Sequence, residues 1–484
     1  MKKHLYIGIA LILLATIFVT FFSYTTSPIY SELGDTPDSP IFQMIGKYWT
    51  KGAIPYKDLW DLKGPYIFLV NATGYWLTGT RTGVYLLQIA YMLLTLIPIY
   101  NIFAICHTSK KSLIMTALSL MALSYIYEGG NLTEEYILPL LSLSFFLITK
   151  WLNVYEQDKK IVHPPVYALI YGFVLGLSLM SRLTNALSVF AAAMVIAVVL
   201  LTNKLYKNLF LNALSMTVGF TCSTLPFFAY FFHHSALTEM WNATFLYALR
   251  YAGNASSEIM NTGIHYFILS YLGSILLMSI AILRCWQQKA LTVRTWVWMM
   301  SAALPFIWFC QGNGFGHYGM TVFPLTVIAL SEIYSLRLKR IVLLSVIVLL
   351  TIASASKVRY MWVMYHWNNA EVANYTEFIK KVPEVDYSSF VAYNCSPNIY
   401  LSLDIQPATP FFALQDFAIE RNPLLRKDVI GAFSTKQPLW ILLSKDDNEH
   451  PQIQQILDAD YKVVATDESK HITLYRNINV HKDQ

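Results

Sequence analysis

The chain has 484 residues, of which 55% are hydrophobic and only 13% are charged. Soluble domains carry about a quarter charged residues, and this deficit, together with repeated apolar runs of about 18 residues or more, excludes an ordinary soluble protein. The net charge of +6 does not indicate a nucleic-acid-binding protein, because Lys and Arg gather in short segments between the apolar runs. These features predict an α-helical polytopic membrane protein.

The apolar runs predict transmembrane helices in chain order. Eleven are expected, within a few residues, at 5–22, 82–105, 112–126, 134–150, 166–181, 186–202, 209–231, 264–283, 295–310, 319–334 and 341–356. The first is expected to be uncleaved rather than a secretory signal, because its apolar run is long and no small-residue cleavage site follows. With the N-terminus inside, every cytoplasmic segment contains Lys or Arg, as the positive-inside rule requires. The C-terminus is then expected outside a bacterial cytoplasmic membrane.

Two domains are expected from the change in composition near residue 356. Residues 1–356 are predicted to form the transmembrane domain, with a long, acid-rich first outer loop at 23–81. Residues 357–484 are predicted to form a small soluble α/β domain, with strand-like runs at 389–393, 439–443, 461–465 and 471–475 and helix-like stretches at 369–382 and 451–459. The outer loop at 232–263 has apolar residues at helical spacing, and we expect it to lie along the membrane surface.

The unusual polar residues at membrane depth all fall on the predicted outer side. They are Glu134, Glu135, Arg182, His317 and Tyr318. We expect them to converge on one cavity with residues of the first outer loop, namely Asp35, Asp38, Asp58, Asp61 and Lys63. The middles of the predicted transmembrane helices contain almost no ionisable residue, whereas a transporter places such residues along its pathway. The pattern therefore favours an enzyme that works at one face, although a transporter or flippase for lipid-linked glycans is an alternative.

Each of these residues also has a purely structural interpretation. Asp38 precedes Ser-Pro and suits the start of a helix, and Asp58, Asp61 and Lys63 suit a solvated surface with a local ion pair. Glu134 and Glu135 follow Thr133, so they suit the first turn of a helix, where the helix dipole favours acids. Arg182 suits an anchor at the interface and His317 a loop histidine. The joint placement of these residues on one side carries the functional argument.

Carboxylates and basic residues at the outer lipid boundary suit the transfer of a sugar from a lipid phosphate to a hydroxyl. The acceptor needs a general base, for which Asp is suitable, and the departing phosphate needs Lys, Arg, His or a divalent cation such as Mg²⁺ or Mn²⁺. The sequence has no Gly-rich phosphate loop. A lipid-carried donor fits that observation, and a ligase or polymerase using lipid-diphosphate-linked glycans is a second alternative.

The order of these motifs resembles the GT-C class of multi-spanning glycosyltransferases, which use polyprenyl-phosphate sugars. Within that class, the chain is similar to bacterial relatives of protein O-mannosyltransferases and lipid A aminoarabinose transferases. The matching elements are Pro-Asp-Ser-Pro-Ile-Phe at 37–42, Gly52, Lys-Gly-Pro at 63–65, Thr-Glu-Glu-Tyr at 133–136, the Gly-containing stretch 172–182 that ends in Arg182, and the stretch 317–324 from His317 to a Pro. They cover about residues 1–335 in order.

The resemblance implies an inverting transfer with Asp38 as the general base. Asp35 is the alternative base, because Ser follows Asp38 where many members of the class carry a second acid. Glu134 or Glu135 would orient the donor phosphate, directly or through a cation. The donor phosphate itself would be bound by Lys63, Arg182 and His317, and Tyr318 lies beside His317 in the matched motif. The sequence does not identify the sugar or say whether the acceptor is a protein, a lipid or a polysaccharide.

Overall fold

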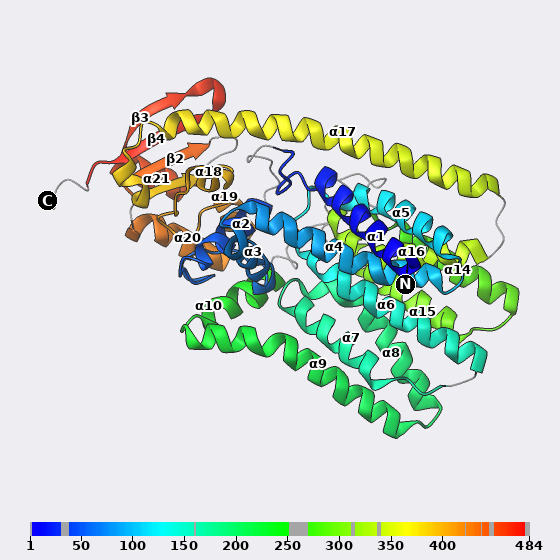
Figure 1. The fold of residues 1–484 in the computed structure, drawn as a ribbon. Helices are drawn as coiled ribbons and strands as arrows, with labels where there is room; N and C mark the ends of the chain where they lie inside the picture. The colour runs from blue at the N-terminus through cyan, green and yellow to red at the C-terminus, as the bar shows by residue number, and fades with distance from the viewer. Residues whose placement is uncertain are drawn as a thin grey trace. The chain divides into compact units, whose positions relative to one another are not determined.

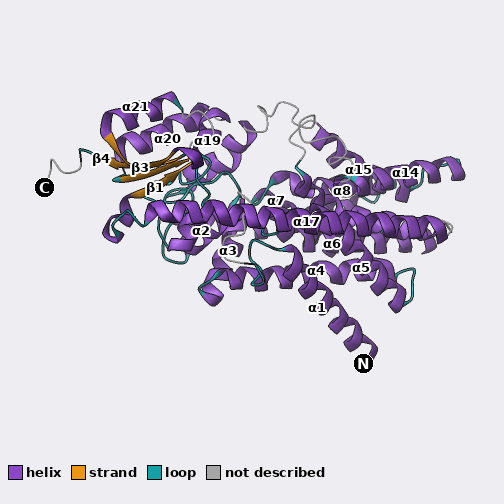
Figure 2. Cartoon of the chain, turned by 90° about the horizontal axis from the view of Figure 1, so that it is seen from above, coloured by secondary structure: helices purple, strands orange, loops and turns teal. Residues whose placement is uncertain are grey.

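The structure of the chain is a computed structural model. It describes residues 2–30, 38–158, 161–250, 270–310, 315–335, 340–421, 423–436, 438–444 and 450–479. Asp35 lies outside the described residues. Within them, helices dominate, and the strands form one small sheet (Figure 2). Contacts divide the chain into two compact units, each assembled from several stretches of sequence.

Unit 1 comprises Met1–Ser23, Tyr85–Ala229 and Ala255–Tyr360, and its described residues are helical (Figure 1). Three of its helices continue into unit 2: α4 (Arg81–Ala104), α9 (Tyr206–His233) and α17 (Arg340–Ile379). The others are α1 (Lys2–Phe22), α5 (Ser109–Ile126), α6 (Thr133–Asp158), α7 (Pro165–Leu179), α8 (Leu187–Thr202), α14 (Leu272–Gln288), α15 (Val293–Cys310) and α16 (Phe323–Ser335), with short 3-10 helices η1 (Leu183–Ala186) and η3 (Gly316–Val322). Each predicted transmembrane stretch overlaps one of these helices, and residues 264–269 of the stretch predicted at 264–283 lie outside the described residues.

Six of the described helices are long and apolar enough to cross a membrane, judged by length and composition. They are α1, α4, α6, the stretch Leu183–Thr202 that contains α8, α9 and α15. Two more, α7 and α14, are apolar but shorter. The chain is a multi-pass membrane protein, and the expected count of eleven transmembrane helices stays a prediction.

Two of the predicted helix boundaries differ from the structure. The stretch predicted to start at 319 begins as the 3-10 helix η3 and becomes α-helical only at α16. The stretch predicted to end at 356 continues without interruption through α17 to Ile379, and it includes most of the helix predicted separately at 369–382. The reason is local, because α17 contains no Gly or Pro to end it.

A partly buried ion-pair network joins four helices of unit 1. The guanidinium of Arg294 on α15 lies 2.8 Å from a carboxylate oxygen of Glu156 on α6 and 3.2 Å from one of Glu332 on α16. Arg284 on α14 also pairs with Glu332. Charges enclosed in this way are stable only when they are paired, so the network fixes the mutual packing of these helices.

Unit 2 comprises Tyr24–Val84, Tyr230–Asn254 and Met361–Gln484. Its sheet contains β1 (Phe390–Tyr393), β2 (Trp440–Ser444), β3 (Tyr461–Asp467) and β4 (Ile472–Asn477), in the order β1-β2-β4-β3. The β1–β2 pair is parallel, and the other two pairs are antiparallel. The four strands lie within a few residues of the predicted runs, so the α/β character of the C-terminal part is confirmed.

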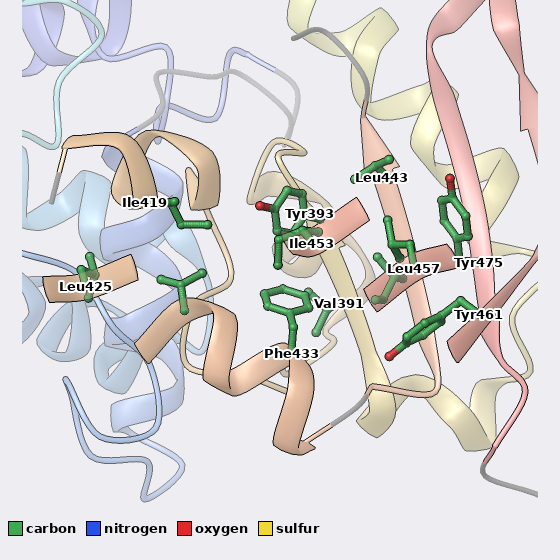
Figure 3. Packing of buried hydrophobic residues seen from close by; sticks show 12 residues of the cluster. Val391, Tyr393, Ile419, Leu425, Phe433, Leu443, Ile453, Leu457, Tyr461 and Tyr475 are labelled. Carbon is green, nitrogen blue, oxygen red and sulfur yellow. The ribbon is translucent and has the colours of Figure 1, made fainter. Parts of the chain in front are cut away.

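The sheet is covered by α19 (Gln415–Arg421), α20 (Pro423–Lys436) and α21 (Pro451–Asp460), while α18 (Asn398–Leu403) follows β1. Figure 3 shows their shared core, in which Val391 and Tyr393 of β1 lie near Phe433 of α20 and Leu443 of β2. All these side chains are buried. Because β1 and β2 are buried along their whole length, their sequences are continuously apolar rather than alternating.

The predicted first outer loop contains two helices, α2 (Asp38–Trp49) and α3 (Pro65–Thr78). A helix start at Asp38 was one interpretation of the sequence, whereas α3 was not predicted. Helix α3 is apolar on almost every side, so it shows no clear periodicity. Its boundaries are nevertheless marked in the sequence, because Pro65 is its first residue and Gly79 ends it in the left-handed conformation, with φ of 72°.

The predicted surface helix in the later outer loop is present in part. It consists of α10 (Leu237–Trp241) and the π-helix η2 (Asn242–Tyr247). Residues 251–269 of that loop lie outside the described residues.

Candidate functional site

Three predicted site residues of the first outer loop meet in unit 2, and we call them the Asp38 cluster: Asp38, Asp61 and Lys63. Asp38 is the first residue of α2, and Lys63 lies two residues before α3. The Lys63 Nζ is 3.6 Å from the Asp38 Oδ2. The Asp61 Oδ2 accepts a hydrogen bond of 3.1 Å from the backbone N–H of Lys63. The cluster therefore places one carboxylate beside the Lys63 ammonium group and a second beside the Lys63 backbone.

The packing of α2 against α3 sets the geometry of the Asp38 cluster. Asp38 is the first residue of α2, and Lys63 lies just before α3, so the distance between the two helices controls the distance between the two side chains. The two helices touch at Gly46, where an added Cβ would lie 2.5 Å from the Asn71 Cβ and 2.6 Å from the Ala72 N. Gln43 of α2 is buried and accepts a hydrogen bond of 3.2 Å from the Tyr75 hydroxyl of α3. The backbone of α2 thus lies against α3 at a separation that only glycine permits.

The stretch between α2 and α3 is ordered by its own hydrogen bonds. The buried Tyr56 donates its hydroxyl to the Lys63 carbonyl at 2.8 Å. The Asp58 Oδ2 accepts from the Ile54 N–H at 2.7 Å. Asp58 is therefore engaged in the turn itself, and its structural interpretation is favoured over a role in the Asp38 cluster.

Asp61 differs electrostatically from an ordinary surface acid. Burial raises its pKa to about 6, against the attraction of Lys63, and the nearby negative charge of Asp38 raises it further. Asp61 thus changes protonation close to neutral pH. Because Asp61 gains or loses its charge in this range, the net charge of the cluster depends on pH.

The C-terminal α/β part holds the loop that carries the cluster. The Trp60 N–H donates to the Pro410 carbonyl at 3.0 Å. The indole ring of Trp60 packs between Phe411 and Tyr247, with ring centroids 5.5 Å and 6.3 Å away. Because Trp60 immediately precedes Asp61, this anchor fixes the backbone at the cluster.

A second contact joins α2 to the C-terminal part. Asp404 lies 3.0 Å from the ammonium groups of both Lys47 and Lys51, and it accepts a hydrogen bond from the Tyr48 hydroxyl at 3.3 Å. Partial burial acts to raise the pKa of Asp404, but hydrogen bonds to Lys51 and Lys47 outweigh it and lower the pKa. Asp404 therefore remains ionised and paired at neutral pH.

Three predicted site residues of unit 1 also meet, and we call them the Arg182 cluster: Glu134, Arg182 and Tyr318. Glu134 lies in the first turn of α6, where the helix dipole favours an acid, and its side chain is almost completely buried. The Arg182 guanidinium lies 3.0 Å from the Glu134 carboxylate. It also stacks on the Tyr318 ring, with 3.2 Å between the Arg182 Cζ and the ring centroid. This arrangement combines an ion pair with a cation–π contact.

Glu135, the neighbour of Glu134, points to different partners. It is buried, its oxygens accept from Gln88 and from the Asn131 N–H, and it also bonds to the Tyr127 hydroxyl. These contacts tie the turn before α6 to α4 and occupy the carboxylate. The two glutamates therefore do not share a partner.

His317 bonds through its Nδ1 to the Glu128 carboxylate at 2.6 Å. Glu128 lies in the turn before α6 with φ of 46°, and its pairing with His317 was not foreseen. The rings of His317 and Tyr318 also make an edge-to-face contact, with 4.6 Å between ring centroids. His317 therefore links the Glu128 carboxylate to Tyr318.

Among the described residues, no group of three or more His, Cys, Asp or Glu side chains is arranged to hold a metal ion. Glu134 is engaged by Arg182 and by the Thr133 hydroxyl, and Glu135 has the partners given above. The expected Mg²⁺ or Mn²⁺ at Glu134 and Glu135 therefore does not fit this arrangement, and no chemical step is derived through a metal.

The fold is similar to that of solved membrane-protein structures. The described residues form apolar helices, two helices in the predicted first outer loop, and a small C-terminal α/β part. ArnT from Cupriavidus metallidurans bound to undecaprenyl phosphate has a similar structure, with a TM-score of 0.57 and 14% identity over 99% of this chain and 98% of that chain. Its apo state matches with a TM-score of 0.56 and 13% identity over the same shares.

The family is shown by sequence. Residues 3–356 match the family model described as "Putative competence-induced protein Ccs4 N-terminal domain". The match covers more than half of the chain, which therefore belongs to this family. The search of curated proteins returned no match.

Several residues that shape these clusters were missed by the sequence analysis. Gly46, Tyr56 and Trp60 adjoin the predicted acids, but their role depends on contacts with residues far away in the chain. Asn185, one turn after Arg182, is fully buried. This polar amide stands close to Arg182 and between two apolar stretches of the sequence, so the sequence alone could have indicated it as a further candidate site residue.

Proposed function

We propose that the protein is a membrane glycosyltransferase that transfers a sugar from a polyprenyl-phosphate donor to an acceptor hydroxyl. The reaction takes place on the outer face of the cytoplasmic membrane, with the N-terminus inside. The proposal is supported by the GT-C fold and by the Asp38 cluster, in which a carboxylate at a helix start is held beside a lysine. The Asp38–Lys63 pair is the single observation that carries it.

In the proposed reaction, Asp38 removes the proton of the acceptor hydroxyl. The acceptor oxygen attacks the anomeric carbon from the face opposite the phosphate, and a new C–O bond forms while the bond to the phosphate oxygen breaks. Polyprenyl phosphate leaves with the bonding electron pair, and the configuration of the sugar is inverted. Lys63 compensates the negative charge that develops on the phosphate.

The predicted residues of unit 1 other than Glu135 act on the donor in this proposal. Glu134, Arg182 and Tyr318 form one group, and His317 lies next to Tyr318. Glu135 supports the turn that precedes α6. Asp35 remains the alternative base to Asp38.

The test is an Asp38→Asn variant, which keeps the size of the side chain and removes its basicity. Transfer from synthetic polyprenyl-phosphate sugars by purified protein in lipid nanodiscs is measured with an envelope extract as acceptor. We expect turnover to fall by about 10²–10⁴-fold, the usual effect of losing a general base. Asp458→Asn on α21, which removes an exposed carboxylate, is the control and should retain turnover.

Wild-type turnover by Asp38→Asn would show that Asp38 is not the base. Lipid diphosphate donors are assayed in parallel, because a ligase or polymerase would use them and ignore the monophosphates. The acceptor and the sugar are found by deleting the protein and comparing glycoproteins, lipids and surface glycans by mass spectrometry.

A further inference from the structure

The segment after Arg182 contains buried polar groups that have no hydrogen-bond partner among the described residues. Asn185 is fully buried, and neither its amide oxygen nor its amide nitrogen is bonded. The hydroxyls of Ser181, Thr184 and Ser188 are likewise buried and unbonded. Of the buried amide side chains that the structure describes, Asn185 is the one in which both polar atoms lack a partner.

These groups lie beside the Arg182 cluster. The Asn185 N–H donates to the Arg182 carbonyl at 3.0 Å, so the two residues are one turn apart. The short helix η1, which contains Asn185, packs against α6 and against η3. Those two elements carry Glu134 and Tyr318, the partners of Arg182.

Unused hydrogen-bonding capacity on this scale is unusual in a folded protein, because a buried polar group without a partner is costly. Helical Ser and Thr hydroxyls elsewhere in unit 1, such as that of Ser144, also lack a partner. The hydroxyls alone are therefore weak evidence. The doubly unbonded amide of Asn185 next to a buried ion pair is the stronger observation.

The chemistry of the groups selects the type of ligand. Arg182 is already neutralised by Glu134 at 3.0 Å, so the cluster offers little net positive charge to a phosphate. A phosphate also provides mainly acceptors, whereas the Asn185 oxygen needs a donor. A sugar hydroxyl both donates and accepts, and it matches an amide and serine or threonine hydroxyls.

We propose that Asn185 and the Arg182 cluster recognise hydroxyl groups of the sugar carried by the lipid donor. This assignment rests on the proposed glycosyltransferase function and makes this segment of unit 1 the determinant of sugar specificity. It changes the expected role of Arg182, which binds the sugar rather than the phosphate.

The test compares transfer of a panel of polyprenyl-phosphate sugars that differ by one hydroxyl, either missing or epimeric. The wild-type protein is expected to prefer one sugar, as measured by kcat/KM. Asn185→Leu, which has a similar size and no polar atoms, is expected to lose about 3–10-fold for each hydrogen bond to the preferred sugar. It should lose little for the analogue that lacks the recognised hydroxyl, so the preference between the two falls.

Asn185→Ser, which retains a donor and an acceptor, covers the case in which the leucine variant fails to fold, and it should keep part of the preference. Ser144→Ala is the matched control, because its hydroxyl is also buried and unbonded but lies ten residues after Glu134 in α6, about 15 Å along the helix. It should leave the preference unchanged.

The outcomes separate a failure of this inference from a failure of the proposed function. If the Asn185 variants lower turnover equally for all sugars, Asn185 is structural and this inference is wrong, while the proposed function stands. If the wild-type protein transfers none of the sugars to any acceptor, the proposed function fails, and this assignment fails with it.

Discussion

The contact between α2 and α3 gives the sharpest test of how the fold positions the Asp38 cluster. In a Gly46→Ala variant, the new Cβ would lie 2.5 Å from the Asn71 Cβ and 2.6 Å from the Ala72 N, against at least 3.4 Å for an ordinary contact. The helices must therefore separate by about 0.9 Å at this point, because backbone atoms cannot rotate away. Asn71 and Ala72 are both part of α3.

This separation is large enough to matter for the reacting groups. Asp38 begins α2, Lys63 is followed closely by α3, and their charged atoms are 3.6 Å apart. A rigid shift of about 0.9 Å lengthens the pair beyond 4 Å, the usual limit of an ion pair. Misplacement by about 1 Å costs about 10²-fold in turnover, and the overpacking itself costs about 1–3 kcal/mol of stability.

Thermal unfolding and transfer kinetics of the purified variant measure both effects. Gly431→Ala is the matched control in the same unit, because no atom lies within 4 Å of its added Cβ; in helix α20 it should raise stability by up to about 1 kcal/mol. If Gly46→Ala unfolds and turns over like the wild-type protein, the close contact does not set the geometry of the cluster, and the reasoning is refuted.

Two further predictions concern the same unit. Trp60→Ala removes the partly buried ring packed on Phe411 and Tyr247. It should lower stability by about 1–3 kcal/mol and speed proteolysis of the predicted first outer loop, whereas Trp60→Phe should retain part of the anchor. Equal proteolysis of all three proteins would contradict the anchoring role. Asp61→Asn should remove a pH dependence of the unfolding free energy. The pKa of Asp61 is about 6 in the folded protein, above its ordinary value of 3.8. The stabilising contribution of protonated Asp61 is therefore present at low pH and is lost as the pH rises through 6. The unfolding free energy of the wild-type protein should thus fall from about pH 4 to pH 7 relative to the variant, and parallel pH profiles from chemical denaturation would show that Asp61 does not titrate there.

The membrane class, the helix positions and the strands of the C-terminal part could be predicted because they depend on local pattern. Long apolar runs need no knowledge of their neighbours to be read as membrane helices. The strands at 390–393 and 440–444 were visible as short apolar runs for the same reason. Helix α3 was not predicted because it is apolar on almost every side, so its sequence has no hydrophobic periodicity to detect.

The pairing of the charged residues could not be predicted, because it depends on contacts between distant segments. Glu134 and Glu135 are adjacent and chemically equivalent in the sequence, yet one pairs with Arg182 and the other bonds to Tyr127. Successive helical residues point about 100° apart, so the packing of α6 against its neighbours decides which of them meets the arginine. Likewise, the sequence by itself determined that Asp38 and Lys63 belong to one acidic outer loop, whereas only the packing of α2 against α3 at Gly46 decided that they meet, because a separation of a few ångströms is set by tertiary contacts and not by local pattern.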